Sequence, residues 1–218
     1  MADARAEVLG RVRAALGPSP AAVDVPRRYR GVGRVGPAGA PDVVDRFCAR
    51  VEEYSATVRR VDRADLPAVI AAVCRERGTA RLAVPPGGLG ADGAIEGVEL
   101  VEDDPPLAPR ALDEIDGVLT GCALAIAETG TIALDGGPRS GRRALTLVPD
   151  HHICLVEAGD ILAGVPDAVE RLSEAARAGR PITLVSGPSA TSDIELDRVE
   201  GVHGPRRLDV IVSGWAPT

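Results

Sequence analysis

Lysine is absent from this chain of 218 residues, so its 25 basic residues are all arginine. Together with 32 acidic residues they give a formal net charge of −7, which provides no overall positive field to attract nucleic acid. No apolar run approaches the length that spans a bilayer, and the first residues carry charges of both signs instead of a secretory leader. These absences predict a cytoplasmic protein with no membrane span and no nucleic-acid partner.

Aromatic residues make up only 2% of the chain, although 45% of its residues are hydrophobic. The core must therefore be built from Ala, Val, Leu and Ile, which suits packed layers of strands and helices. The cysteines form no Cys-x-x-Cys pair, and no dinucleotide fingerprint follows a predicted strand, so we expect neither a metal cluster nor another cofactor in this chain. We expect four buried thiols in a reducing compartment: Cys48, Cys74, Cys122 and Cys154.

The composition of the chain changes near residue 40. Residues 3–16 place apolar side chains at helical spacing, whereas the stretch from Gly17 to Pro41 is rich in Gly, Pro and Arg. We therefore predict an N-terminal helix and a flexible linker over residues 1–40, followed by one folded domain over residues 41–218. The sequence leaves open whether the N-terminal helix packs on its own domain, stays disordered or reaches a partner.

Hydrophobic periodicity predicts an alternation of helices and strands beyond residue 41. Helices are expected at 41–55, 65–77 and 166–178, where apolar residues recur on one face. Strands are expected at 56–61, 81–85, 117–126 (alone or with a short helix), 131–135, 144–148, 153–156, 181–185 and 208–212. Strands and helices alternate at both ends of this region, with several consecutive strands between. This order predicts an α/β domain with a mixed sheet covered by helices on both faces.

The densest group of polar residues runs from Ser186 to Glu195. Because residues 181–185 are typical of a buried strand, Ser186 begins the turn at its carboxyl end, where open α/β sheets hold their ligands. A hydroxyl in this run can also cap a helical turn, whose free N–H groups favour an anion. The alternative is a plain turn and cap. The candidate anion-binding residues of this run are Ser186, Gly187, Ser189 and Thr191.

The chain has three histidines, of which two are adjacent. Successive side chains on a strand face opposite ways, so His151 and His152 cannot easily share one metal ion. His203 follows the polar run and is expected to act as a hydrogen-bonding or acid–base group, because an unperturbed imidazole titrates near neutrality. The weaker alternative is a cation site built from Asp193, Glu195 and His203.

A glycine-rich loop over residues 136–143 concentrates three arginines. Arginine pairs bidentately with carboxylate or phosphate, so this loop is the best candidate anion clamp in an acidic chain. A solvated loop is the alternative. The arginines of this candidate site are Arg139, Arg142 and Arg143, with Arg206 and Arg207 as further contributors.

Three segments carry a resemblance to a known family: Ala127–Thr131, Ser186–Glu195 and Gly201–Leu208. Over about residues 43–213 the chain resembles the LUD-domain family, in particular its lactate utilization C group. The resemblance implies a role in bacterial lactate metabolism, in which such proteins act with an iron–sulfur partner and a second subunit to oxidise L-lactate to pyruvate. It also implies a fold like that of ribose-5-phosphate isomerase and the CoA transferases.

Glu128 stands in the motif Glu-Thr-Gly-Thr, which joins two apolar strands. The CoA transferases, whose fold the resemblance implies, place a nucleophilic glutamate in a comparable turn, and carboxylate nucleophiles are established in enzymes. The alternatives are a ligand for a substrate hydroxyl and a charged residue at a hairpin bend. Thr129 and Gly130 of the same motif are candidate binding residues.

These observations predict a subunit of the L-lactate utilization system that binds a small anionic ligand and leaves the iron–sulfur cluster to a partner. The alternatives are a free-standing enzyme resembling a CoA transferase or a ligase, with Glu128 as nucleophile, and a regulatory module that senses a small acid. The candidate catalytic residues are Glu128 and His203. We further predict that the Ser186 turn, the Glu128 bend and the arginine loop converge on one cleft at the carboxyl edge of the sheet.

Overall fold

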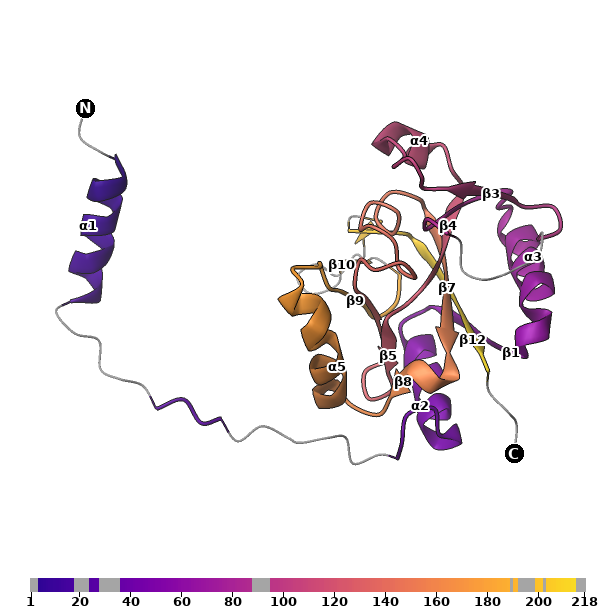
Figure 1. The fold of residues 1–218 in the computed structure, drawn as a ribbon, viewed down its shortest axis with the longest axis horizontal. Coiled ribbons are helices and arrows are strands. Elements are labelled where there is room, and N and C mark those ends of the chain that lie inside the picture. Colours follow the sequence, from indigo (N-terminus) through magenta and orange to yellow (C-terminus); the bar gives the residue numbers. More distant parts are fainter. Residues whose placement is uncertain are drawn as a thin grey trace. The chain divides into compact units, whose positions relative to one another are not determined.

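The structure is a computed structural model, and it describes residues 4–17, 24–27, 36–87, 95–188, 190–191, 199–201 and 203–214. The chain separates into two units, Met1–Arg30 and Gly31–Thr218 (Figure 1). Helix α1 (Ala4–Leu16) belongs to the first unit and buries no side chain of its own. Its apolar residues Val8, Val12 and Leu16 are exposed, and Arg11 pairs with Glu7 one turn earlier. No described helix is long and apolar enough to cross a membrane.

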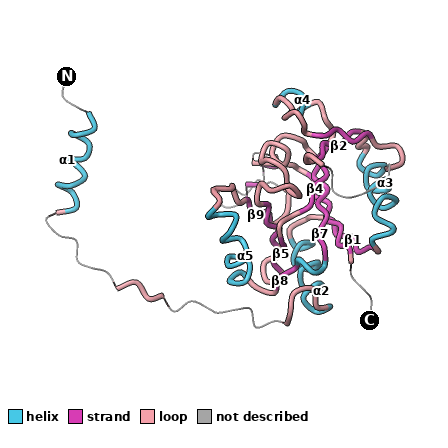
Figure 2. Tube along the Cα trace, in the orientation of Figure 1, coloured by secondary structure: helices cyan, strands magenta, loops and turns pink. Residues whose placement is uncertain are grey.

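The second unit is built on a six-stranded parallel sheet (Figures 1 and 2). Strands β7 and β4 lie near its centre and bury nearly every residue, as parallel sheets covered on both faces do. The strands, in spatial order, are β1 (Thr57–Val61), β12 (Arg207–Ser213), β7 (His151–Glu157), β4 (Gly117–Gly121), β2 (Arg81–Val84) and β3 (Glu99–Glu102).

A smaller four-stranded sheet packs beside the parallel one. Its pairings are mixed, because β5 and β6 form an antiparallel hairpin while β5 and β8 run parallel. Its strands, in spatial order, are β8 (Ile161–Leu162), β5 (Leu124–Ile126), β6 (Thr131–Leu134) and β9 (Thr183–Val185). A short antiparallel ribbon joins β10 (Ala190–Thr191) to β11 (Val199–Glu200).

In the described part of the second unit, four helices cover these sheets. Each starts with proline in its first turn, where the missing N–H costs nothing. Helix α3 ends at Gly78, whose φ of +69° is the left-handed conformation that glycine adopts most easily. The helices are α2 (Pro41–Glu53), α3 (Leu66–Arg77), α4 (Pro109–Asp113) and α5 (Val165–Arg177), with 3₁₀ turns at Arg63–Asp65 (η1) and Ala158–Asp160 (η2).

Successive side chains on a strand face opposite ways, so alternate residues of a strand pack into different layers of the domain. On β7, Ile153 packs against helix α3, whereas Cys154 joins the core that contains helix α2 and the inner face of the smaller sheet. On β6, Ile132 faces that same core, and Ala133 packs under helix α5. The order of layers is therefore α3, parallel sheet, α2 with the smaller sheet, and α5. Phe47 of α2, fully buried, fills the middle of the shared core.

The α/β class is confirmed, but three details of the sequence prediction are wrong. The large sheet is parallel, and the mixed pairing belongs to the smaller sheet. Residues 117–126 form two strands in different sheets. Residues 144–148 form successive turns, in which Leu147 and Val148 both donate to the Ala144 carbonyl. Both edges of β7 are occupied by β4 and β12, so residues 144–148 cannot pair with the strand that follows them.

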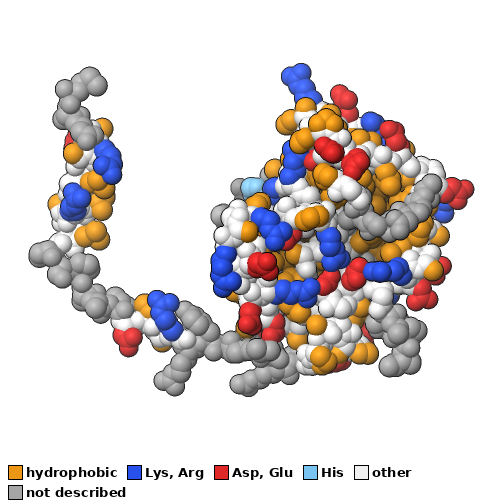
Figure 3. Space-filling model, viewed as in Figure 1, with side chains coloured by type: hydrophobic (Ala, Val, Ile, Leu, Met, Phe, Trp, Pro, Cys, Tyr) orange, Lys and Arg blue, Asp and Glu red, His pale blue; other side chains and the backbone are white. Residues whose placement is uncertain are grey.

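The segment 181–185 also differs from the prediction of a buried strand. Strand β9 lies at the edge of the smaller sheet, antiparallel to β6, and Leu184 is 61% exposed. The Ser186 turn therefore does not stand at the carboxyl edge of the parallel sheet. On the face of the molecule shown in Figure 3, arginine and acidic side chains alternate and form no single basic area.

Candidate functional site

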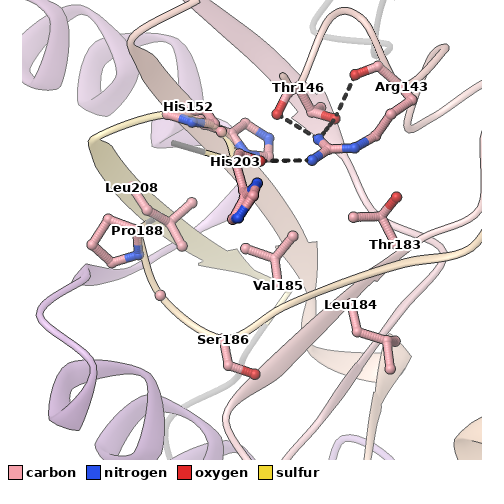
Figure 4. A pocket seen from close by; sticks show the side chains of 13 residues that line it. Arg143, Thr146, His152, Thr183, Leu184, Val185, Ser186, Pro188, His203 and Leu208 are labelled. Carbon is pink, nitrogen blue, oxygen red and sulfur yellow. Dashed lines mark hydrogen bonds between the residues drawn. The ribbon is translucent and has the colours of Figure 1, made fainter. Parts of the chain in front are cut away.

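A cavity of about 320 Å³ opens on the α2 side of the parallel sheet, next to the first residues of β7 and β12. One wall is polar, and the segment from Thr183 to Ser186 forms the facing wall (Figure 4). The cavity joins four segments that are distant in sequence. Its lining residues are Arg143, Thr146, His152, Thr183, Leu184, Val185, Ser186, Gly187, Pro188, His203, Gly204, Pro205 and Leu208.

Arg143 supplies the cationic group of this cavity. Its Nη1 donates to the carbonyl oxygen of Thr146 at 2.7 Å and to the Thr146 hydroxyl at 3.0 Å, and its Nη2 donates to the carbonyl oxygen of His203 at 2.9 Å (Figure 4). Within the described part of the chain, no carboxylate pairs with Arg143. Burial lowers the pKa of its guanidinium, because desolvation disfavours the charged form. An anion in the cavity would relieve that cost.

The other two arginines of the glycine-rich loop have structural partners. Arg142 donates from Nε and Nη2 to the two carboxylate oxygens of Asp103, at 2.7 and 2.9 Å. Burial acts to raise the pKa of Asp103, but the hydrogen bonds from Arg142 and from the Leu107 N–H outweigh it and leave the pKa lowered. Arg139 pairs with Asp160 at 2.6 Å and is absent from the cavity lining. The loop thus places one arginine in the cavity, and the expectation of a three-arginine clamp is wrong.

The two adjacent histidines face opposite sides of β7, as the strand periodicity predicts. His152 lines the cavity, and its Nε2 lies 2.8 Å from the Thr120 hydroxyl of the neighbouring strand β4. His151 lies on the α3 side of the sheet, where it meets Asp209. His152 is a cavity residue that the sequence did not predict, since the adjacent histidines stood out only as possible metal ligands. No local pattern in the sequence assigns His152 to this cavity, because the other lining residues come from other segments of the chain.

A buried thiol pair lies beneath His152. Cys154 accepts hydrogen bonds from the Cys122 thiol and from His152, and these outweigh burial and lower its pKa. The hydrogen bond between the two thiols, together with burial, raises the pKa of Cys122 well above its ordinary value. All four cysteines are free and buried, as the sequence predicts.

The Ser186 turn and the Glu-Thr-Gly-Thr motif meet through a chain of hydroxyls. The Thr131 hydroxyl lies 2.7 Å from the hydroxyls of both Thr129 and Ser186. Both turns rest on helix α2, and each needs glycine there. A Cβ on Gly130 (φ +61°) would lie 2.7 Å from the carbonyl carbon of Arg50, and one on Gly187 (φ +99°) would lie 2.7 Å from Tyr54.

Glu128 lies at the other end of its motif and is absent from the cavity lining. Its Oε2 accepts a hydrogen bond of 3.4 Å from the Val165 N–H, at the first residue of helix α5. A carboxylate at this position is stabilised by the helix dipole. The described lining of the cavity contains His203 and Ser186 but not Glu128. The prediction of a single cleft is therefore wrong in two respects. Glu128 does not line the cavity, and the cavity adjoins the amino ends of β7 and β12 instead of the carboxyl edge of the sheet.

The remaining candidates are placed as follows. Arg206 pairs with Asp150 and lines a different pocket. Thr191 lies in strand β10. Ser189, Asp193 and Glu195 lie outside the described residues, so the alternative cation site with His203 cannot be assembled from described atoms. Among the residues that the structure does describe, no group of three or more His, Cys, Asp or Glu side chains is placed to hold a metal ion.

Comparison with known proteins gives consistent results. Residues 107–213 match the LUD domain. A lactate utilization protein C from Deinococcus radiodurans is 48% identical over 178 residues, which are 82% of each chain. A lactate utilization protein C from Halalkalibacterium halodurans is 32% identical over 104 residues, 46% of this chain and 45% of that protein.

A solved structure supports the same relationship. The crystal structure of a DUF162 family protein from Deinococcus radiodurans superposes with a TM-score of 0.68 at 43% sequence identity, covering 79% of this chain and 96% of that one. The likeness therefore extends over most of the second unit as well as over the sequence motifs. The chain belongs to the LUD-domain family, among the lactate utilization C proteins.

Proposed function

We propose that this protein is a subunit of a bacterial L-lactate utilization system and that the cavity beside Arg143 binds a small carboxylate of that system. Family membership supports a role in lactate utilization. The observation that carries the ligand proposal is the guanidinium of Arg143, which is partly desolvated and faces an open cavity without a carboxylate partner among the described residues.

The chemistry of the cavity suits a small acid. A guanidinium can hold a carboxylate through two parallel hydrogen bonds, and such charge-assisted bonds are about twice as strong as neutral ones. His203 stands in the same lining and can meet a hydroxyl or carbonyl group next to the carboxylate. Val185 and Leu208 supply the apolar surface that would cover a methyl group. In this proposal His203 keeps the acid–base role predicted from the sequence.

The iron–sulfur cluster of the system is assigned in this proposal to a partner protein. The cysteines of this chain are all buried, and Cys74 lies in a different core cluster from the other three. They therefore do not offer the set of convergent thiolates that a cluster takes. The protein would act in the cytoplasm, and we relate its parallel sheet with flanking helices to the ribose-5-phosphate isomerase and CoA transferase folds. The alternative of a free-standing transferase gains no support from Glu128, which lies outside the cavity.

Isothermal titration of the full chain with L-lactate and with pyruvate tests the ligand proposal. Losing a hydrogen bond to a charged group costs about 1.5–3 kcal/mol, so Arg143→Met should weaken binding by roughly 10- to 150-fold, and Arg143→Lys by less. Arg63→Met is the matched control, because Arg63 is exposed and pairs with Glu157 away from the cavity. Equal binding by the wild type and Arg143→Met, or no binding of either acid by the wild type, would refute the ligand proposal.

The role in the pathway needs a separate measurement. The test uses a bacterial strain that no longer grows on L-lactate because its lactate utilization C protein has been deleted. Expression of the wild-type chain should restore its growth. Arg143→Met should restore growth poorly and Arg63→Met fully. Growth restored equally by both variants would dissociate the cavity from the lactate pathway.

A further inference from the structure

A second chain of polar groups lies on the opposite face of β7 and takes no part in the cavity beside Arg143. His151 stands between a hydroxyl and a carboxylate: its Nδ1 lies 3.0 Å from the Thr79 Oγ1, and its Nε2 lies 3.0 Å from Asp209 Oδ2. Arg77 continues the chain by donating from Nε to Asp209 at 3.0 Å. The side chains of His151 and Asp209 are each only 1% exposed, whereas Thr79 and Arg77, at the two ends of the chain, border a cavity.

The partners of His151 determine which ring nitrogen carries the proton. Burial acts to raise the pKa of Asp209, but hydrogen bonds from His151 and Arg77 outweigh it and lower the pKa, so the group is a carboxylate that only accepts. Nε2 of His151 must therefore donate to Asp209. In the neutral ring, Nδ1 is left with its lone pair and accepts the hydroxyl proton of Thr79. A hydroxyl, an imidazole and a carboxylate thus form one chain in the order that activates a nucleophile.

This chain ends at a pocket. Thr79 lines a polar cavity of about 610 Å³ formed by the end of α3, the segment after α4 and the loops that precede β7 and β12. Gly204 borders both this cavity and the one beside Arg143, so the two lie on either side of the loop before β12. Arg207 donates to the Arg77 carbonyl, and within the described residues no carboxylate pairs with it. The lining also contains four acidic residues: Asp113, Glu114, Asp116 and Asp150. Asp150 pairs with Arg206, so Arg207 is the cationic group of this cavity that has no carboxylate partner among the described residues.

We propose that Thr79 is the nucleophile of a second, acyl-transfer site, with His151 as its general base and Asp209 as the group that orients His151. The substrate class is a small carboxylic ester with a negative charge of its own, which Arg207 attracts. This site is independent of lactate binding in the other cavity, and either proposal can fail without the other.

The reaction balances without any external redox partner. The Thr79 Oγ attacks the ester carbonyl while its proton passes to His151 Nδ1, and the proton then passes to the departing alcohol as the ester bond breaks. The acyl group is now esterified to Thr79. A water molecule gives a proton to His151 and attacks that ester, and the proton returns to Thr79 as the acid leaves. Asp209 remains ionised throughout and stabilises the protonated ring.

The experiment compares two acetyl esters that differ in charge, 4-acetoxybenzoate and neutral phenyl acetate, on the full chain. Release of the phenol is followed by absorbance, and acetylated peptides are identified by mass spectrometry. Because the chain contains no lysine, background acetylation of amines is confined to the N-terminus. We expect an acetyl group on Thr79 and faster turnover of 4-acetoxybenzoate than of phenyl acetate. Arg207→Met should remove that preference.

Variants at Thr79 make the assignment decisive. Thr79→Val keeps the shape of the side chain and should lower the rate by at least about 100-fold, whereas Thr79→Ser should retain activity. Ser173→Ala, which removes a half-buried hydroxyl on α5 outside both cavities, should match the wild type. Urea midpoints and circular dichroism check that each variant is folded.

Any of the following results would overturn the proposal. Hydrolysis by folded Thr79→Val at the wild-type rate would exclude the nucleophile, as would acetylation found only at other residues. Absence of any turnover by the wild type above that of Thr79→Val would show the chain of hydrogen bonds to be structural. Equal rates on the two esters would refute the role of Arg207 and the charged substrate class.

Discussion

Replacing Arg142 by methionine should destabilise the domain, because Arg142 neutralises a buried carboxylate. Asp103 is 2% exposed and receives both Arg142 hydrogen bonds as well as one from the Leu107 N–H at 2.8 Å. Removing one partner of a buried ion pair costs about 3–5 kcal/mol, since the remaining charge stays desolvated. Arg142 is itself 37% exposed, and the Leu107 hydrogen bond remains, so we expect the lower end of that range, about 3 kcal/mol.

The assay is urea unfolding at pH 7, followed by circular dichroism. The double variant Asp103→Asn with Arg142→Met removes the buried charge as well and should be more stable than Arg142→Met alone. Lowering the pH should also stabilise Arg142→Met relative to the wild type, because burial without the guanidinium raises the pKa of Asp103 and lets it take up a proton. A second consequence is weaker L-lactate binding, since Arg142 anchors the loop that carries Arg143.

Two outcomes would refute this reasoning. A loss of less than about 1 kcal/mol in Arg142→Met would show that the pair behaves as a solvated surface contact. Equal destabilisation of the single and double variants would show that the uncompensated charge of Asp103 is not the cause.

Three further predictions concern acid, a helix terminus and the N-terminal unit. The pKa values of Asp103 and Asp209 are lowered in the folded state, so these two carboxylates stabilise the fold at pH values above their ordinary pKa of about 3.9. This contribution should be lost as the pH falls through the lowered pKa values, and the urea midpoint should drop in that range. Asp103→Asn should make the drop smaller. Glu128→Gln should lower the free energy of unfolding by roughly 0.3–1 kcal/mol through the α5 dipole, and an unchanged urea midpoint would exclude this role. Deleting residues 1–35 should leave one cooperative thermal transition near the wild-type midpoint. Deleting residues 36–40 as well should lower the midpoint temperature, because Gly39 donates a hydrogen bond to the Ile161 carbonyl. A broad, non-cooperative transition after the first deletion would contradict the expectation.

Local sequence patterns predicted most elements because helix and strand periodicities depend on neighbours along the chain. The helix from Leu66 to Arg77 was predicted from its apolar face and from Gly78, and both features act within one or two turns. The same holds for β7, whose run of apolar residues indicates burial on both faces. The segment 144–148 has an equally apolar pattern but forms turns. An apolar segment becomes a strand only where it can pair with a neighbouring strand, and the position of that neighbour depends on residues elsewhere in the chain.

The candidate site was predicted in part. Ser186, Arg143 and His203 do line one cavity, whereas Glu128 does not. The difference between Arg143 and its neighbour Arg142 could not be read from the loop sequence. Arg142 is paired because Asp103, distant in sequence, lies buried beside it, and no local pattern encodes that contact.

The sequence by itself determined the α/β class, the burial of the cysteines and the opposite orientation of His151 and His152, because each follows from composition or from the two-residue repeat of a strand. Only the tertiary structure decided which polar groups share a cavity. The neighbouring parallel strands β7 and β12 bring His151 and Asp209 together, and the segment before β2 adds Thr79; these contacts depend on strand order and register, which the linear sequence does not display.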